Sequence, residues 1–312
     1  MAIDTEASEL EPTGGTADVT FTVAPASTGR KARFGEVVRG LLHNATFMVG
    51  AIILLFWIVD AIIWGLSGAL WQWHFPYDPQ ALDPLNTLAG PSATHWFGTD
   101  DFGRDVFSRV LAGATSVLTV AVVATALGLL GGITIGLVAG YYRGIVDDVL
   151  MRLVDALLSF PSIIIGVLVL TVLGSSQTNV ILVIAIVFTP IVARTVRSAV
   201  LVEREREYVA AAKLLGASGP YIMAREILPN ITGPIVVEGT VRLGYAIFTA
   251  ATLSFLGFGL QQPSPDWGLT ISLGRNLLGI APWIVLFPAF ALATLVVAIN
   301  FVADGLKEVL ES

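Results

Sequence analysis

The sequence predicts an all-α polytopic membrane protein with six transmembrane helices. Of the 312 residues, 55% are hydrophobic and only 13% are charged. Several apolar runs exceed the ~18 residues that a helix needs to cross the hydrocarbon core of a bilayer. These runs lack the alternation of polar and apolar residues that a barrel strand requires, and backbone groups in lipid must be satisfied within their own segment. Each run is therefore expected to be a helix.

The chain begins with an acidic segment. Residues 1–29 contain five acidic residues and no basic one, and they are rich in Thr, Ala, Gly and Ser. We expect a disordered leader of no fixed structure, with a regulatory tail as the alternative, because such a composition buries too little apolar surface to fold. It does not resemble a signal peptide, which would have a basic start and an apolar middle.

Residues 30–46 lead into the first span. Apolar residues such as Val38 and Leu42 recur here with helical spacing, whereas Glu36 and Arg39 fall on the other side. This pattern predicts an interfacial amphipathic helix that lies on the membrane surface. An ordinary flanking segment is the alternative.

The six spans follow, each about 20 residues long. We place them at residues 47–70, 114–140, 154–173, 180–200, 235–256 and 283–302. The second span is rich in glycine, which indicates close packing against another helix of this chain or of a partner. Pro161 lies early in the third span, where a kink or a late helix start is tolerated.

Lysine and arginine residues indicate which side of the membrane each loop occupies. The basic residues before the first span, between spans two and three, between spans four and five, and after span six all fall on one side. The other side holds only Arg104, Arg109 and Arg275. Both termini and residues 203–230 are therefore expected in the cytoplasm, and residues 71–113 and 257–282 are expected to form outer loops.

The sequence contains no enzymatic or metal-binding motif. There is no Cys, which excludes disulfides, thiolate zinc sites and Cys nucleophiles. The three histidines, His43, His74 and His95, have no metal-ligand spacing. None of the three lysines ends a GxxxxGK phosphate loop, and HExxH and GxSxG are absent. We therefore expect a transport subunit with no catalytic, cofactor or metal site and no nucleic-acid partner.

Two charged residues within the spans are candidates for a transport pathway or for ion pairing. Asp60 lies in the outer half of the first span and has no partner in its own helix. Arg242 lies in the fifth span, four residues after Glu238. This spacing favours a local ion pair, and we expect it near the inner end of the helix, where an arginine can snorkel.

The most informative segment is the charged stretch at residues 203–230, which we call the polar insert. Small residues before Gly216 form a smooth helix face. Gly216 is expected to end that helix because glycine tolerates the left-handed conformation that follows a helix C-terminus. Pro220 can open a second short helix, and Pro229 can close it. The predicted shape, two short helices at a fixed bend, suits a knob that another protein grips.

The polar insert resembles the cytoplasmic coupling motif of bacterial ABC importer permeases, often called the EAA loop. The matching segments are AAAKLLG at 210–216 and EILP at 226–229. Ala210 stands where the glutamate of the motif's name can stand, and Glu226 stands where an aliphatic residue is expected. The resemblance implies docking on an ATPase subunit through Glu207, Ala210, Ala211, Ala212, Leu215, Gly216, Ala217, Ser218 and Pro229.

A second resemblance covers most of the chain after the leader. HWFGTDDFGRDVFSRVLAGATSVL at 95–118 is similar to a signature of the C-type subunit of dipeptide and oligopeptide permeases, and residues 147–165 and 253–268 are similar to two further segments of that family. The signature residues in the outer loop are Gly98, Thr99, Asp100, Gly103, Arg104 and Asp105. Several of these, with Asp101, can also cap a helix that begins near Arg104.

The family resemblance implies a type I ABC importer permease fold in the bacterial plasma membrane. It implies a heteromeric importer that contains a second, paired six-span permease, two ATPase subunits or one dual ATPase, and an extracytoplasmic substrate-binding protein. ATP and Mg would bind to the ATPase subunits, and this chain would bind no cofactor. Spans two to five would line most of the central cavity.

The expected cargo is dipeptides or oligopeptides. Nickel chelates, glutathione and haem are alternatives within the same permease branch, because the binding protein largely selects the cargo. A self-sufficient secondary transporter is an alternative of another class, which would need inverted repeats and more buried acids. A scaffolding membrane protein is a third alternative, and the polar insert argues against it.

Overall fold

The computed structural model describes residues 38–66 and 76–311. Within these ranges the chain is helical, and its only β-type pairing is an isolated antiparallel bridge between Thr99 and Asp105. The predicted all-α fold is therefore confirmed. The acidic leader expected at 1–29 lies outside the described residues.

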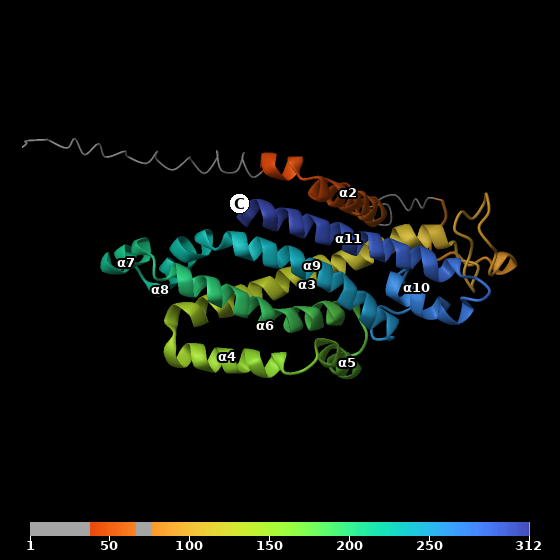
Figure 1. Cartoon of the computed structure of the whole chain (residues 1–312). Helices are drawn as coiled ribbons and strands as arrows, with labels where there is room; N and C mark the ends of the chain where they lie inside the picture. Colours follow the sequence, from red (N-terminus) through yellow and green to blue (C-terminus); the bar gives the residue numbers. More distant parts are fainter. Residues whose placement is uncertain (1–37, 67–75, 312) are drawn as a thin grey trace, which may run out of the picture.

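The helices form an elongated bundle (Figure 1). In chain order they are α2 (Ala45–Leu66), α3 (Val106–Tyr142), α4 (Gly144–Leu158), α5 (Ser162–Leu173), α6 (Gln177–Glu203), α7 (Glu207–Leu214), α8 (Gly219–Tyr221), α9 (Thr232–Phe255), α10 (Trp267–Gly274) and α11 (Trp283–Glu311). Among the described residues, α2, α3, α6 and α11 are each long and apolar enough to cross a membrane, and α4 with α5 makes a fifth candidate if the bent pair is one span. The predicted six spans also require α9. Charged and small residues lower the hydropathy of its first half.

The second span is longer than the sequence predicted. The expected range was 114–140, whereas α3 runs over 37 residues from Val106 to Tyr142. At 1.5 Å per residue this length is about 55 Å, well beyond the ~30 Å hydrocarbon core. The helix starts early because Asp105 caps it, and the carboxylate accepts a 2.8 Å hydrogen bond from the Ser108 N–H.

The third predicted span, at 154–173, is broken rather than continuous, and its first helix begins earlier than predicted. The structure has two helices in its place, α4 and α5, and they meet at an angle of 85°. The break falls just before α5, which begins at Ser162 with Pro161 as its N-terminal cap. Proline has no N–H, and its ring clashes with the carbonyl group four residues earlier, so α4 cannot continue through this position.

Glycines on α3 allow α6 to approach closely. A Cβ atom added at Gly132 would lie 2.4 Å from Cβ of Val192, and one added at Gly136 would lie 2.7 Å from the carbonyl oxygen of Ala193. Neither position has room for a side chain, so the two backbones pack directly on each other. Packing within this chain, rather than against a partner, therefore accounts for these glycines.

The first span lies at the edge of the bundle, beside α11 (Figure 1). Trp57 attaches it to the rest, because its Nε1 donates a 3.2 Å hydrogen bond to Thr294 Oγ1 and its ring packs edge-on against Trp267. The opposite face of α2 is apolar and exposed. Residues 38–43 form a separate helical turn before α2 and are the described part of the predicted interfacial helix.

Candidate functional site

The polar insert has two limbs, which correspond to the two predicted short helices. The first limb is α7, and it ends just before Gly216, as the sequence predicted. Gly216 has a φ of +80°. Its N–H donates to the carbonyl oxygen of Lys213 at 3.0 Å, and the Ala217 N–H donates to that of Ala212 at 3.0 Å. This pair of hydrogen bonds is the Schellman arrangement, which satisfies the last carbonyl groups of a helix and turns the chain sharply.

The second limb differs from the single short helix that the sequence predicted. After α8 the chain widens into a π-helix over Ile222–Ile227 and then tightens into a 3₁₀ turn over Leu228–Asn230. Pro229 does not close this limb but lies inside the 3₁₀ turn. Because proline lacks the N–H of a regular α-helical hydrogen bond, the chain changes its helical type around it.

Both limbs are anchored in the bundle. Val209, Ile222, Ile227 and Ile231 are buried in one cluster with apolar residues at the neighbouring ends of α3 and α6. The Tyr208 hydroxyl donates to Glu203 at 2.7 Å and accepts from Asn230 at 3.2 Å, so it links the two limbs. Burial and the hydrogen bond to Glu203 raise the pKa of Tyr208 to about 12, which keeps the phenol protonated. The base of the polar insert is therefore held rigidly.

The tip of the polar insert is apolar and exposed. Leu214 and Leu215 are 90% and 88% exposed. Next to them is a groove of about 420 Å³, lined by Ala212, Leu215, Gly216, Ala217, Ser218, Tyr221 and Glu226. Glu207, Ala210, Ala211 and Pro229 are also exposed, so the structure gathers the residues singled out in this segment on one projection. Two adjacent, almost fully exposed leucines on a rigidly anchored projection form a surface that another protein can cover.

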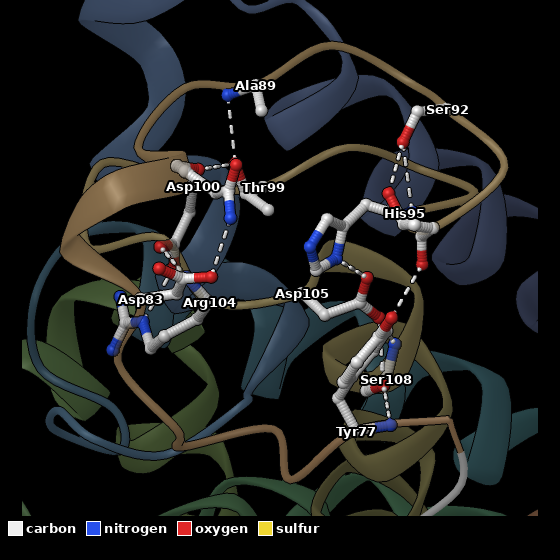
Figure 2. A network of polar contacts seen from close by, with 12 residues as sticks. Tyr77, Asp83, Ala89, Ser92, His95, Thr99, Asp100, Arg104, Asp105 and Ser108 are labelled. Carbon is white, nitrogen blue, oxygen red and sulfur yellow. Dashed lines mark hydrogen bonds and ion pairs between the residues drawn. The ribbon is translucent and has the colours of Figure 1, made fainter.

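The outer-loop signature forms a compact polar network at the other end of the bundle, near α10 (Figures 1 and 2). Asp100 is its centre: Oδ1 accepts from the N–H groups of Phe102 and Arg104, both at 2.9 Å, and Oδ2 accepts from Arg104 Nε at 2.7 Å. Thr99 accepts a 2.9 Å hydrogen bond from the Ala89 N–H and donates to the Asn86 carbonyl group. These residues fold the loop upon itself.

The expected helix cap at Thr99, Asp100, Asp101 and Gly103 is wrong. The helix begins two residues after Arg104, and Asp105 caps it. Gly103 is in a left-handed turn with a φ of +76°, and a Cβ atom there would lie 1.9 Å from the Asp83 carbonyl oxygen. Because this turn is stabilised by Asp100, the chain enters the helix only after it.

His95, Asp105 and Ser108 contain the residue types of a hydrolase triad but not its arrangement (Figure 2). The Ser108 hydroxyl donates to Asp105 Oδ2 at 2.8 Å, and His95 Nδ1 is 2.9 Å from Asp105 Oδ1. A triad requires the serine on the imidazole and the carboxylate behind it. Here the carboxylate lies between the other two, so the set orders a helix N-terminus and does not activate a nucleophile.

We call the described parts of the two outer loops, residues 76–113 and 257–282, the outer cap. Arg109 joins three segments of it. Its side chain is 1% exposed. Nη1 donates to the Pro79 carbonyl oxygen at 3.0 Å and Nη2 to that of Ser264 at 2.9 Å, while Nε is 3.8 Å from Asp100 Oδ2. The sequence marked Arg109 only as a basic residue on the outer side. Its position one turn after Asp105, in an otherwise apolar stretch, is the signal for a buried role.

Comparison with known proteins decides the family. Residues 132–312 match the family described as binding-protein-dependent transport system inner membrane component. The chain belongs to this family. As an ABC importer permease it is similar to the dipeptide transport system permease protein DppC of Alkalihalophilus pseudofirmus, at 42% identity over 276 residues and 88% of each chain.

Other relatives are named for a different transported substrate. The glutathione transport system permease protein GsiD of Pectobacterium atrosepticum is 40% identical over 245 residues, which cover 78% of this permease and 81% of the relative. Among solved structures, a chain of the MetNI methionine ABC transporter in inward-facing conformations has a TM-score of 0.54 at 20% identity and covers 65% of this permease and 96% of itself. The predicted ABC permease fold is therefore confirmed.

The helix bundle of the permease contains the two charged residues that the sequence singled out, Asp60 and Arg242. Arg242 Nε donates to Glu238 Oε1 at 2.6 Å. Asp60, on α2, is 9% exposed, and its Oδ2 has no hydrogen-bond partner among the described residues. The structure therefore pairs Arg242 with Glu238 and leaves this oxygen of Asp60 unsatisfied.

Two ion pairs between α4 and α6 were missed. Arg197 forms two 2.5 Å hydrogen bonds with Asp147, and Arg194 forms one of 2.5 Å with Asp155. The arginines were assigned to an uninterrupted fourth span, although their three-residue spacing places both on one helix face. These pairs attach α4, the element before the bend, to the long helix that leads into the polar insert.

Proposed function

We propose that this permease is one of two paired membrane subunits of an ATP-driven importer that moves dipeptides or oligopeptides into the cytoplasm. The names of the relatives support this cargo class, since DppC is a dipeptide permease and glutathione is itself a small peptide. The partners would be a second permease, ATPase subunits that bind ATP and Mg, and an extracytoplasmic substrate-binding protein.

The exposed leucine tip carries the coupling part of the proposal. ATP binding would bring the ATPase subunits together, and the polar insert would transfer that movement as a rigid body into α6 and α9, which flank it. Leu214 and Leu215 would be buried in a groove of the ATPase, with Glu207 at its rim. The anchored base favours this role, because a flexible base would absorb the movement.

Cytoplasmic placement of the polar insert agrees with its basic residues. The C-terminal end of α11 lies at the same end of the bundle as α7 and α8, opposite the outer cap (Figure 1). Both ends of the chain would then be cytoplasmic in the inner membrane. The outer cap would face the binding protein.

A charge placed on the tip tests the coupling role. Leu215→Glu should reduce the amount of ATPase that co-purifies with the tagged permease by on the order of tenfold or more, because a buried leucine contributes about 1.5–3 kcal/mol and an unpaired buried carboxylate adds a desolvation cost. Leu85→Glu is the matched control, since Leu85 is 94% exposed but lies in the outer loop. Equal ATPase recovery with the two variants would contradict docking at the tip.

Glutathione is a second candidate cargo because of the GsiD relatives. A strain that lacks the gene should lose uptake of labelled dialanine if the permease carries short peptides generally. Loss of glutathione uptake with normal dialanine uptake would assign the narrower cargo. Normal uptake of both would contradict the proposed function.

A further inference from the structure

We propose that Glu238 and Arg242 of α9 form a transient binding station for the charged ends of a peptide on its way through the membrane. The inference rests on the proposed function, because it takes a peptide with free termini as the cargo. Arg242 would bind the terminal carboxylate, and Glu238 would bind the terminal ammonium group.

The pair lies at mid-height in the bundle. Arg242 follows Thr232, the first residue of α9, by ten residues. At 1.5 Å per residue this is about 15 Å, half of the ~30 Å hydrocarbon core. Its guanidinium carbon is 6.0 Å from the ring of Phe188, which lies near the middle of α6. This position does not fit the snorkelling arginine near a helix end that the sequence suggested.

The ion pair leaves the two terminal nitrogens of Arg242 without a hydrogen-bond partner among the described residues. Arg242 reaches Glu238 only through Nε. Neither terminal nitrogen is completely enclosed, and the Arg242 side chain as a whole is 16% exposed. The second oxygen of Glu238 accepts a single long hydrogen bond, 3.4 Å from Thr195 Oγ1. An arginine with a free planar fork fits a carboxylate through two parallel hydrogen bonds.

The helix face around the pair is polar and aromatic. Glu238, Arg242 and Tyr245 follow one another at helical spacing, and Thr249 and Thr252 continue the same face. Tyr245 is 55% exposed, and its ring centroid is 5.1 Å from the Arg242 guanidinium carbon. Charged groups within a membrane face a bundle interior or a water-filled cavity, because contact with lipid costs several kcal/mol. This face therefore fits the wall of a hydrated path better than a surface against lipid.

Binding of the peptide termini suits a permease that must transport peptides of many different sequences. Every peptide with free ends carries an α-carboxylate and, at neutral pH, mostly an α-ammonium group, whatever its side chains are. The station would bind weakly, because Glu238 competes with the cargo for Arg242. Weak binding is what transport requires, since the peptide has to leave again.

A charge swap separates this role from simple ion pairing. The double variant Glu238→Arg with Arg242→Glu keeps an ion pair at the same spacing but reverses the order of its charges. We expect it to accumulate in the membrane and co-purify with its ATPase, while uptake of labelled dialanine in the deletion strain falls at least tenfold. Uptake at the wild-type rate would overturn the proposal, because a purely structural pair would be satisfied by the swap.

Cysteine labelling tests the same station without altering the pair. The chain contains no Cys, so a single introduced thiol has no background from this subunit. Tyr245→Cys should react with a charged, membrane-impermeant thiol reagent in membrane vesicles, and dialanine supplied with the binding protein should slow the reaction. Phe56→Cys, on the exposed face of α2, is the control and should not react. No reaction at position 245, or a rate that dialanine does not change, would overturn the proposal.

The two proposals fail in different ways. If the deletion strain still takes up both dialanine and glutathione at the full rate, the proposed function fails and this inference fails with it. If deletion abolishes uptake and the swapped variant restores it, the importer stands and only the station is wrong.

Discussion

At the scale of single residues, Asp105 connects the outer loop to the first long helix. Its carboxylate accepts hydrogen bonds from the Ser108 N–H and hydroxyl groups and contacts the His95 ring nitrogen, all within 2.9 Å. An N-cap aspartate satisfies a backbone N–H that would otherwise have no partner, and it interacts favourably with the positive end of the helix dipole. The side chain is 1% exposed, so water cannot replace it.

Removal of this cap should destabilise the protein. We expect Asp105→Ala to cost about 2 kcal/mol or more, since loss of an N-cap alone costs about 0.5–2 kcal/mol, and the buried Ser108 hydroxyl and the part-buried His95 ring also lose their hydrogen bonds. The measurement is the thermal unfolding midpoint of the detergent-purified protein. Asp101→Ala is the neighbouring control, because Asp101 is exposed and should change the midpoint little. Equal midpoints for the two variants would show that the cap is not required.

Residue roles in the outer loop were only partly predictable. The sequence identified the right cluster from its resemblance to a family signature but assigned the cap to the wrong residues. Asp100, Asp101 and Asp105 are all good capping residues, and the choice among them depends on the turn at Gly103, which brings the loop against Asp83. Such a tertiary contact leaves no local pattern in the sequence.

At the scale of helices, the contact between α3 and α6 depends on the absence of side chains. Gly132→Ala places a methyl group 2.4 Å from Cβ of Val192, so the helices must move apart. We expect this variant to unfold at a lower temperature and to accumulate less. Gly233→Ala is the helical control, because nothing lies within 4 Å of its added Cβ, and alanine favours a helix by about 1 kcal/mol. A Gly132→Ala protein as stable as this control would contradict the close packing.

Helix existence was predicted better than helix continuity. The apolar runs located the long helices because periodicity and length are properties of the local sequence. The break before Pro161 was anticipated as a kink, yet the 85° turn was not, because its angle depends on what α4 and α5 pack against. Ion pairs attach α4 to α6. Asp147 pairs with a residue 50 positions further along the sequence, and Asp155 pairs with one 39 positions further along.

At the scale of the whole molecule, the polar insert and the outer cap lie at opposite ends of the bundle (Figure 1). The number of spans is the weakest of the global predictions. Hydropathy favours four spans or five among the described residues, and α9 is the helix in dispute. The same Glu238 and Arg242 that lower its hydropathy are the residues to which we assign a role on the path. A helix that lines a hydrated path does not need the high hydropathy of a helix that is surrounded by lipid.

Single cysteines at the two ends test this arrangement across the membrane. Leu85→Cys should react with an impermeant thiol reagent in intact spheroplasts, whereas Leu214→Cys should react only in inside-out vesicles. The two leucines are 94% and 90% exposed, so differences in burial within the chain do not confound the comparison. Labelling of both from the same side would contradict the proposed orientation.

The buried guanidinium of Arg109 has a consequence for biosynthesis. One of its carbonyl acceptors, on Ser264, is 155 residues further along the chain. At a translation rate of about 5–20 residues per second, the ribosome makes that acceptor about 8–30 seconds after the arginine. During this interval the charge has to stay hydrated outside the bilayer. The outer cap therefore closes only when synthesis is almost complete, and a protein truncated before Ser264 would expose an arginine without this acceptor, which quality-control proteases could recognise.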